Sequence, residues 1–189
     1  MSRVIVIAAS ILGIGLSVLA NQHDGIVAKE GEVTTLPPKL IELHERYPGC
    51  VKLNDPVMPR SHYAFSAKID GETEVFGILC EPSTYNQPYA IYIVREGYYE
   101  DAERVFFADY NLESGWTGTD LLYNAYFNKN NGVLKGFSKG RGLADCGSQI
   151  SMKWDGEQFS MMEYRYKDAC DENTEKPFPL IYKRHQEKK

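Results

Sequence analysis

The sequence predicts a mainly β protein: an α+β chain with one short N-terminal helix and an antiparallel sheet built from hairpins and stapled by disulfides. Two observations carry this prediction. From Tyr63 onward, apolar and polar residues alternate between turn dipeptides of the x-Gly kind, which is typical of hairpins. The four cysteines form an even set, which in an exported chain favours two disulfide bonds.

The N-terminus has the three parts of a secretory signal. Met1-Ser2-Arg3 is short and basic, residues 4–19 are almost wholly apolar, and Val18-Leu19-Ala20 places small residues where a signal peptidase reads. An uncleaved membrane anchor is the alternative, because such an apolar run approaches the length that spans a bilayer. The Val-x-Ala ending favours cleavage, so we expect residues 1–20 to be a signal peptide and the mature protein to be exported.

The remaining chain is expected to form one domain. We predict an N-terminal segment at residues 21–34 that is flexible, a β-rich domain at residues 35–183 and a charged tail at residues 184–189. Removing residues 1–20 leaves 20 basic against 26 acidic residues, which changes the net charge from −5 to −6. This acidic balance argues against a nucleic-acid partner, because phosphate neutralisation needs a surplus of Lys and Arg.

The cysteines are interpreted as disulfide partners. Three connectivities are open, and we favour the pairing of neighbours along the chain, because it closes short loops around strand pairs: Cys50 with Cys80, and Cys146 with Cys170. A catalytic cysteine is the alternative. No C-x-x-C pair occurs and the four His residues are scattered, so we expect no metal site and no cofactor.

Residues 35–49 are predicted to form the short helix. Thr35 can cap it, Pro37 and Pro38 suit its first turn, and Pro48-Gly49 ends it. Its apolar face is expected to carry Leu40, Ile41 and His44.

Two hairpins are predicted from Asp-Gly turns. Asp70-Gly71 would place Phe65 opposite Phe76 and Tyr63 opposite Ile78. Asp155-Gly156 would place Met152 opposite Phe159 and Ile150 opposite Met161, with a wet face of Ser151, Lys153, Gln158 and Ser160.

A third turn, Asn131-Gly132, is expected to lie in a slightly longer loop that brings Phe127 near Leu134. Two further strands are predicted at Tyr89–Val94 and Arg104–Ala108.

The segment from Lys139 to Gly147, with glycines at 140, 142 and 147, is the densest candidate site. One interpretation is a small anion site in which Lys139 and Arg141 meet a carboxylate or phosphate. The other, which we favour, is a tight corner in which Arg141 pairs with Asp145. We expect Gly140 or Gly142 to have a positive φ and Arg141 to have an acidic or carbonyl partner.

The same segment carries a family resemblance. K-G-R-G-L-A-D-C-G at residues 139–147, W-D-G at 154–156, Phe159, Cys170 and P-x-I-Y at 179–182 resemble the bacterial domain-of-unknown-function family numbered 1176. Asn124, Phe127, Gly132, Leu134 and Phe137 agree with its earlier part, so the resemblance covers about Asn124 to Tyr182. Ala144 replaces the usual Gly, and Met152 stands where Trp is common. The resemblance implies a periplasmic address and a disulfide at Cys146, but no established activity.

Tyrosines are concentrated between residues 85 and 99. Exposed, they would suit stacking on sugar rings or anchoring a protein partner. Buried, they would be ordinary strand packing, and at least half are expected to be core. The members are Tyr85, Tyr89, Tyr92, Tyr98 and Tyr99, of which Tyr98 and Tyr99 are the candidate binding residues.

Two acidic patterns are weaker candidates. Asp109 to Gly115 resembles the start of a calcium loop, but the glycine is one residue late, and a polar turn is the favoured interpretation. Glu72 and Glu74 are expected to share a strand face, which leaves a glycosidase-like pair open without supporting it.

These observations favour a non-catalytic envelope binding protein, with a cell-wall enzyme or cell-wall component as candidate partner. No nucleophile signature is present, so we expect no catalytic residues. The alternative is a periplasmic hydrolase of cell-wall or carbohydrate material that uses an acid pair. A purely structural role in the envelope is not separable from the first hypothesis by sequence.

Overall fold

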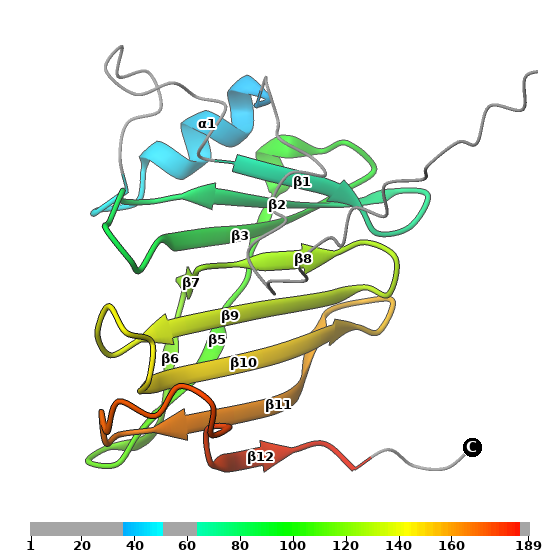
Figure 1. Cartoon of the computed structure of the whole chain (residues 1–189). Helices are drawn as coiled ribbons and strands as arrows, with labels where there is room; N and C mark the ends of the chain where they lie inside the picture. The colour runs from blue at the N-terminus through cyan, green and yellow to red at the C-terminus, as the bar shows by residue number, and fades with distance from the viewer. Residues whose placement is uncertain (1–35, 51–63, 186–189) are drawn as a thin grey trace, which may run out of the picture.

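The computed structural model describes residues 36–50 and 64–185, which form two five-stranded antiparallel sheets, a two-stranded ribbon and one short α-helix (Figure 1). The N-terminal sheet contains β1 (Ala64–Lys68), β2 (Thr73–Leu79), β3 (Pro88–Arg95), β4 (Glu103–Arg104) and β7 (Leu122–Tyr123). The C-terminal sheet contains β8 (Tyr126–Asn128), β9 (Val133–Lys139), β10 (Gly147–Trp154), β11 (Phe159–Lys167) and β12 (Leu180–Lys183). The ribbon consists of β5 (Phe107–Asn111) and β6 (Gly115–Thr119).

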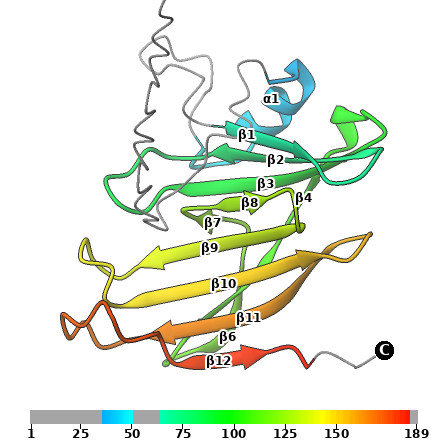
Figure 2. The ribbon, with the colours of Figure 1, turned by 45° about the vertical axis from the view of Figure 1, so that its right-hand side comes forward.

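The mainly β fold class is therefore confirmed. In Figures 1 and 2 the strands of the two sheets follow one another from β1 at one end to β12 at the other, with β8 beside β3. No helix in the described part of the chain has the length and apolarity needed to cross a bilayer.

Helix α1 (Pro38–Glu45) lies within the predicted residues 35–49 but is shorter at both ends. Pro37 is its N-cap residue, and Gly49, beyond its C-terminal end, has a φ of 87°. Leu40 and His44 are fully buried, and Ile41 packs against the same apolar cluster. Thr35, the expected cap, lies outside the described residues.

Both faces of the N-terminal sheet are buried, as the almost continuous apolar runs of β2 and β3 would require. One face packs with Leu40 of α1, and the other packs with residues of the C-terminal sheet and with Phe107 of the ribbon. The first face carries Phe76, Ile78, Ala90, Tyr92 and Val94, and the second carries Phe65, Val75, Leu79, Tyr89 and Ile91.

The pairing predicted across Asp70-Gly71 is wrong by one residue. Phe65 lies opposite Gly77, not Phe76. Since a shift of one residue exchanges the faces of a strand, Phe65 and Phe76 belong to different apolar clusters. Tyr63 lies outside the described residues, and Ile78 pairs with Ala64.

The turn causes this shift. The backbone N–H groups of Glu72 and Thr73 both donate to Oδ1 of Asp70, at 3.2 and 2.8 Å. The N–H of Ile69 donates to the carbonyl of Thr73, so the loop holds three residues rather than two. The aspartate side chain thereby lengthens a turn that the Asp-Gly dipeptide alone would make shorter.

The hairpin at Asp155-Gly156 has the predicted faces but not the predicted pairs. Met152 lies opposite Met161, and Trp154 lies opposite Phe159. The loop spans four residues, because the N–H groups of residues 157 and 158 donate to Oδ1 of Asp155. A shift of two residues preserves the faces, so Met152 is buried as expected. Beyond Met161 a bulge places Tyr164 opposite Ile150.

The other strand predictions have mixed outcomes. Phe127 pairs with Leu134 across the loop that contains Asn131-Gly132, as expected. Tyr89–Val94 lies within β3. Arg104–Ala108 is not one strand, because Arg104 ends β4 in the N-terminal sheet while Phe107 begins β5 in the ribbon.

The favoured disulfide connectivity is confirmed. Cys50 is bonded to Cys80, and Cys146 is bonded to Cys170. The first bond ties the segment after α1 to the end of β2, and the second ties the start of β10 to the segment after β11. No free thiol remains for the catalytic alternative.

Candidate functional site

Arg141 is held inside the glycine-rich corner, as the structural interpretation predicts. Its Nε and Nη2 donate to the two carboxylate oxygens of Asp145 at 2.8 and 2.6 Å. Asp145 is fully buried, and the hydrogen bonds from Arg141 hold the pKa of this carboxyl well below its usual range. Nη2 of Arg141 also donates to the carbonyl of Cys170, and the N–H of Glu172 donates to Asp145. The pair therefore fastens the chain after β11 onto the corner.

The expected positive φ is not at Gly140 or Gly142. It falls instead on Ala144, with a φ of 58°, and on Gly147, with a φ of 123°. Gly140 is required for another reason, because a Cβ there would lie 2.6 Å from Sγ of Cys146. A Cβ on Gly147 would lie 2.0 Å from the carbonyl oxygen of Ser138. The corner thus uses its glycines mainly for close approach.

Lys139 is joined to the N-terminal sheet through its backbone, and the sequence analysis missed this connection. Asn86 hydrogen bonds to both the N–H and the carbonyl of Lys139. Asn124, which has a φ of 46°, donates to Asn86 and to the carbonyl of Phe137. An asparagine tolerates this left-handed conformation better than most residues. The family motif beginning at Asn124 therefore has a structural role.

The tyrosines between residues 85 and 99 divide into core and surface. Tyr89 and Tyr92 are buried, so two of the five are core, fewer than the expected half, and Tyr85 is exposed. Tyr98 is 55% exposed. Tyr99, which begins the short 3₁₀ helix η2 (Tyr99–Asp101), packs edge to face on Phe76.

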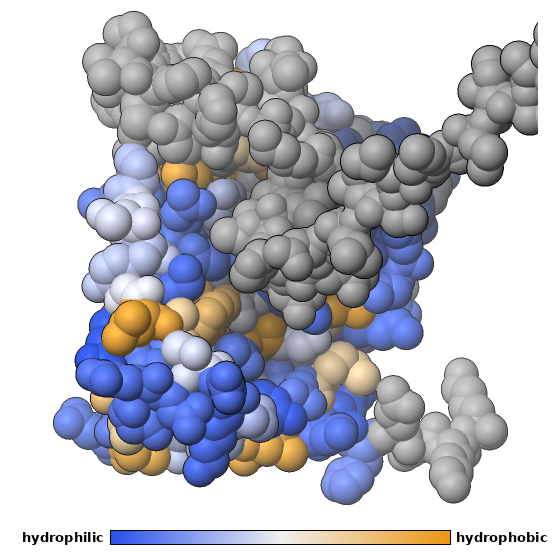
Figure 3. All heavy atoms as spheres, viewed as in Figure 1, coloured by the Kyte–Doolittle hydropathy of each residue, from blue (hydrophilic) through white to orange (hydrophobic). Residues whose placement is uncertain are grey.

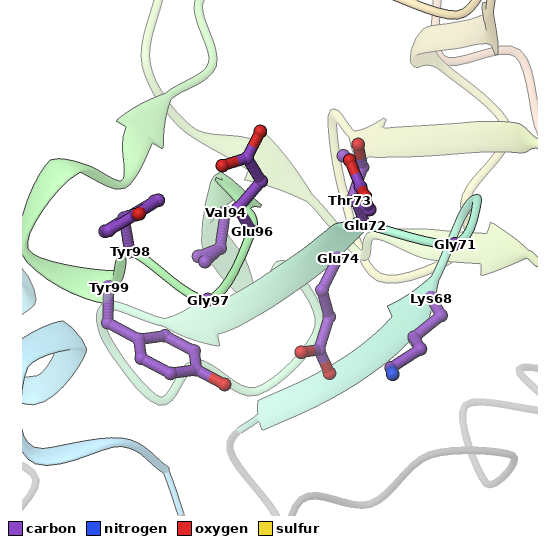
Figure 4. Close-up of a pocket in the computed structure, with 10 residues that line it drawn as sticks. All are labelled: Lys68, Gly71, Glu72, Thr73, Glu74, Val94, Glu96, Gly97, Tyr98 and Tyr99. Carbon is purple, nitrogen blue, oxygen red and sulfur yellow. The ribbon is translucent and has the colours of Figure 1, made fainter.

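Tyr98 and Tyr99 line a groove of about 460 Å³ at the end of the N-terminal sheet (Figure 4). The turn that presents them has positive φ at both Glu96 and Gly97. The groove is also lined by Lys68, Gly71, Glu72, Thr73, Glu74, Val94, Glu96 and Gly97. It therefore carries three carboxylates, those of Glu72, Glu74 and Glu96, against the ammonium group of Lys68. We call it the acidic groove.

The acidic groove and the glycine-rich corner do not open onto one concavity. Asn86, which contacts the corner, precedes β3, whereas the tyrosines of the groove follow it. A strand of eight residues spans roughly 25 Å. No residue of the corner lines the groove.

Glu72 and Glu74 do not share a face, contrary to expectation. Glu72 lies in the three-residue loop, and Figure 4 shows the two side chains pointing to opposite sides of β2. Glu74 instead lies across from Lys68. These two carboxyls therefore do not form a facing acid pair.

The segment from Asp109 to Gly115, whose sequence resembles the start of a calcium loop, contains a polar turn. The N–H groups of Glu113 and Ser114 donate to Oδ1 of Asn111 at 3.0 and 2.8 Å. Asp109 accepts a hydrogen bond from the Tyr164 hydroxyl at 2.6 Å. The oxygens at alternate positions are thus engaged separately, not directed at a common point.

A buried polar cluster beneath α1 was not foreseen. Nδ1 of His44 lies 3.1 Å from the hydroxyl oxygen of Tyr92. Arg104, whose side chain is buried, donates to Asp120 at 2.8 Å and lies 3.7 Å from the ring centroid of Tyr47. Burial, reinforced by the charge of Arg104, lowers the pKa of His44 to about 4. The imidazole is therefore neutral at pH 7.

A row of aromatic rings on the ribbon was also missed. Tyr110 and Trp116 pair across β5 and β6, and they pack against Tyr164 and Tyr166 of β11. Tyr110 and Trp116 are distant in sequence from Tyr164 and Tyr166. Only the crossing of the ribbon over the C-terminal sheet brings them together (Figure 2).

Comparisons with known proteins agree with the resemblance. The family described as "Protein of unknown function (DUF1176)" matches residues 40–184, so the match begins well before Asn124. Over 50 residues the chain is 40% identical to "Uncharacterized protein YpfG" of Escherichia coli strain K12. That alignment covers 26% of this chain and 14% of the Escherichia coli protein. No solved structure matches the chain.

Proposed function

This chain belongs to a family of unknown function, and we propose from its own geometry that it is a non-catalytic binding module of the bacterial envelope that recognises a basic protein. The proposal includes export by residues 1–20 and a periplasmic location. Two disulfide bonds support an oxidising compartment.

The acidic groove is the observation that carries the proposal. Its carboxylates lie on both sides of the start of β2 and in the turn after β3, where an acidic segment follows in the chain, and Tyr98 is exposed at this turn. An exposed tyrosine offers a rigid apolar surface with a polar tip, as interface anchors commonly do. The acidic residues are Glu72, Glu74, Glu96, Glu100, Asp101 and Glu103, against Lys68 and Arg95, and Arg95 is already paired with Glu103.

A basic partner is favoured by this charge distribution. Unlike charges on two surfaces accelerate encounter and exclude acidic competitors. Enzymes that cleave anionic cell-wall material are commonly basic, so we propose a wall-cleaving enzyme as the partner. Glu72 and Glu74, the acid pair left open for the hydrolase alternative, point to opposite sides of β2 and do not support it (Figure 4).

Binding to lysozyme, a basic wall-cleaving enzyme, tests the proposal. We expect the purified mature chain to bind it at 50 mM NaCl and to lose most of that affinity at 300 mM. Tyr98→Ala should weaken binding by about 1 to 2 kcal/mol, and the triple variant Glu72→Gln/Glu74→Gln/Glu96→Gln by at least as much.

A matched variant separates the groove from net charge. Glu81→Gln/Glu157→Gln/Glu175→Gln removes the same charge from exposed positions outside the groove. It should change the affinity less than twofold. Equal losses in both triple variants, or no binding at 50 mM NaCl, would contradict the proposal.

A further inference from the structure

The ribbon and β11 together carry a second binding surface, the aromatic platform of Tyr110, Trp116 and Tyr166, and we propose that it stacks on the pyranose rings of a polysaccharide. This site is independent of the acidic groove. It uses different elements and a different ligand chemistry.

The platform is a set of rings packed edge to face, in which Trp116 is exposed while Tyr110 and Tyr166 are half-buried against the core. Trp116 is 45% exposed, although it is the larger member of a cross-strand pair with Tyr110. Their ring centroids are 5.2 Å apart, and those of Tyr110 and Tyr166 are 5.6 Å apart. Hydrophobic burial alone would favour covering an indole. The open indole at one end of this row, beside Tyr110, is the surface that we assign to ligand contact.

The rings are fixed before any ligand arrives. Tyr164, which is buried beneath them, has its ring centroid 5.1 Å from that of Trp116. Its hydroxyl donates to Asp109 and accepts from the N–H of Tyr110 at 3.1 Å. The turn between β5 and β6 is held by Asn111. Little side-chain entropy remains to be lost on binding, which favours affinity.

Carboxylates border the rings at positions where sugar hydroxyls could donate to them. The Tyr166 hydroxyl donates to Oδ1 of Asp168 at 2.9 Å, and Tyr164 uses Oδ1 of Asp109. Each carboxylate therefore keeps a second oxygen for a ligand hydroxyl. Burial and the negative charges of Asp168, Asp109 and Glu113 raise the pKa of Tyr166.

The open shape of the platform distinguishes a polymer from a small cation. An ammonium ion is held best where rings surround it on several sides. Here Trp116 is followed on β6 by Thr117 and Gly118, which are both exposed. A chain of sugars can run along this strand, with its ring faces on the aromatic residues and its hydroxyls at the carboxylates.

Tryptophan fluorescence provides a direct test, because the chain has only two tryptophans. In Trp154→Phe, which replaces the buried one, Trp116 is the only reporter. We expect β-1,4-linked N-acetylglucosamine tetramer or cellotetraose to shift its emission and to protect it from acrylamide quenching. Choline chloride, the probe for a cation site, should not.

Calorimetry on variants that retain Trp154 completes the test. Trp116→Ala should weaken oligosaccharide binding at least tenfold, and Glu113→Gln/Asp168→Asn about threefold to fivefold. Tyr98→Ala, in the acidic groove, should leave the affinity for the oligosaccharide unchanged. Failure of oligosaccharide binding is therefore distinguishable from failure of lysozyme binding. Circular dichroism establishes that each variant is folded. A fluorescence response to choline but to neither sugar, or equal sugar affinity in wild type and Trp116→Ala, would overturn the proposal.

Discussion

The side chain of Asn86 pairs with the backbone of Lys139 as a neighbouring strand would. Its Nδ2 donates to the carbonyl of Lys139 at 2.7 Å, and the N–H of Lys139 donates to Oδ1 at 2.9 Å. Asn86 lies in the loop between β2 and β3, whereas Lys139 ends β9. The two sheets share no strand ladder, so this amide replaces one at the point where they meet.

Asn86→Asp is expected to destabilise the chain by roughly 1 to 3 kcal/mol, because it keeps the acceptor but loses the donor to Lys139. Asn86→Ala should cost a similar amount, since both groups of Lys139 lose their partner. Urea unfolding measures both. Ser83→Ala, an exposed change in the same loop, is the control. Equal midpoints for Asn86→Asp and wild type would show that water replaces the bond.

Ala144→Gly is expected to stabilise the chain by roughly 0.5 to 1 kcal/mol. Ala144 has a φ of 58°, which costs a residue with a Cβ more than it costs glycine. It also occupies the position where the family pattern has glycine. A lower denaturation midpoint for Ala144→Gly would contradict this explanation.

Two alanine substitutions in the same corner serve as controls. Gly142→Ala should be neutral or slightly stabilising, because its Cβ would enter open space. Gly147→Ala should be strongly destabilising, because its φ is 123° and its Cβ would clash with Ser138. The three variants are compared in one thermal unfolding series.

The free energy of unfolding is expected to decrease as the pH is lowered, because His44 titrates. Because the pKa of His44 is lowered to about 4 from 6.5, the unfolded chain binds more protons than the folded chain between these values. The contribution of His44 is therefore complete above pH 6.5 and is lost as the pH falls through 4, by about 3 kcal/mol in all.

The comparison variant for this prediction is His44→Gln, which does not titrate in this range. Urea unfolding at pH 7.5 and at pH 4 should show a larger loss for wild type than for His44→Gln. The carboxylates contribute to both proteins equally and cancel in the difference. Parallel pH profiles for the two would mean that the imidazole is not kept neutral by the fold.

Local chemistry in the sequence predicted much of the fold. Pro37-Pro38 and Pro48-Gly49 set the ends of α1, because proline and glycine act on their own backbone. The disulfide pairing was predicted from the proximity of the cysteines along the chain. The buried face around Met152 was predicted from the alternation of apolar and polar residues. Both Asp-Gly turns were located correctly, and both registers were wrong, because an aspartate side chain lengthened each loop.

The sequence by itself located most of the strands and both Asp-Gly turns and favoured the cysteine pairing that forms, because these depend on residues close along the chain, whereas the strand expected at Arg104–Ala108 is divided between two sheets. Only the tertiary structure decided that Arg141 donates to the carbonyl of Cys170, and that Trp116 packs on a row of tyrosines. Tyr110 reaches Tyr164 across more than fifty residues of chain. A contact of that separation depends on how sheets and ribbon pack, which no local pattern of apolar and polar residues records.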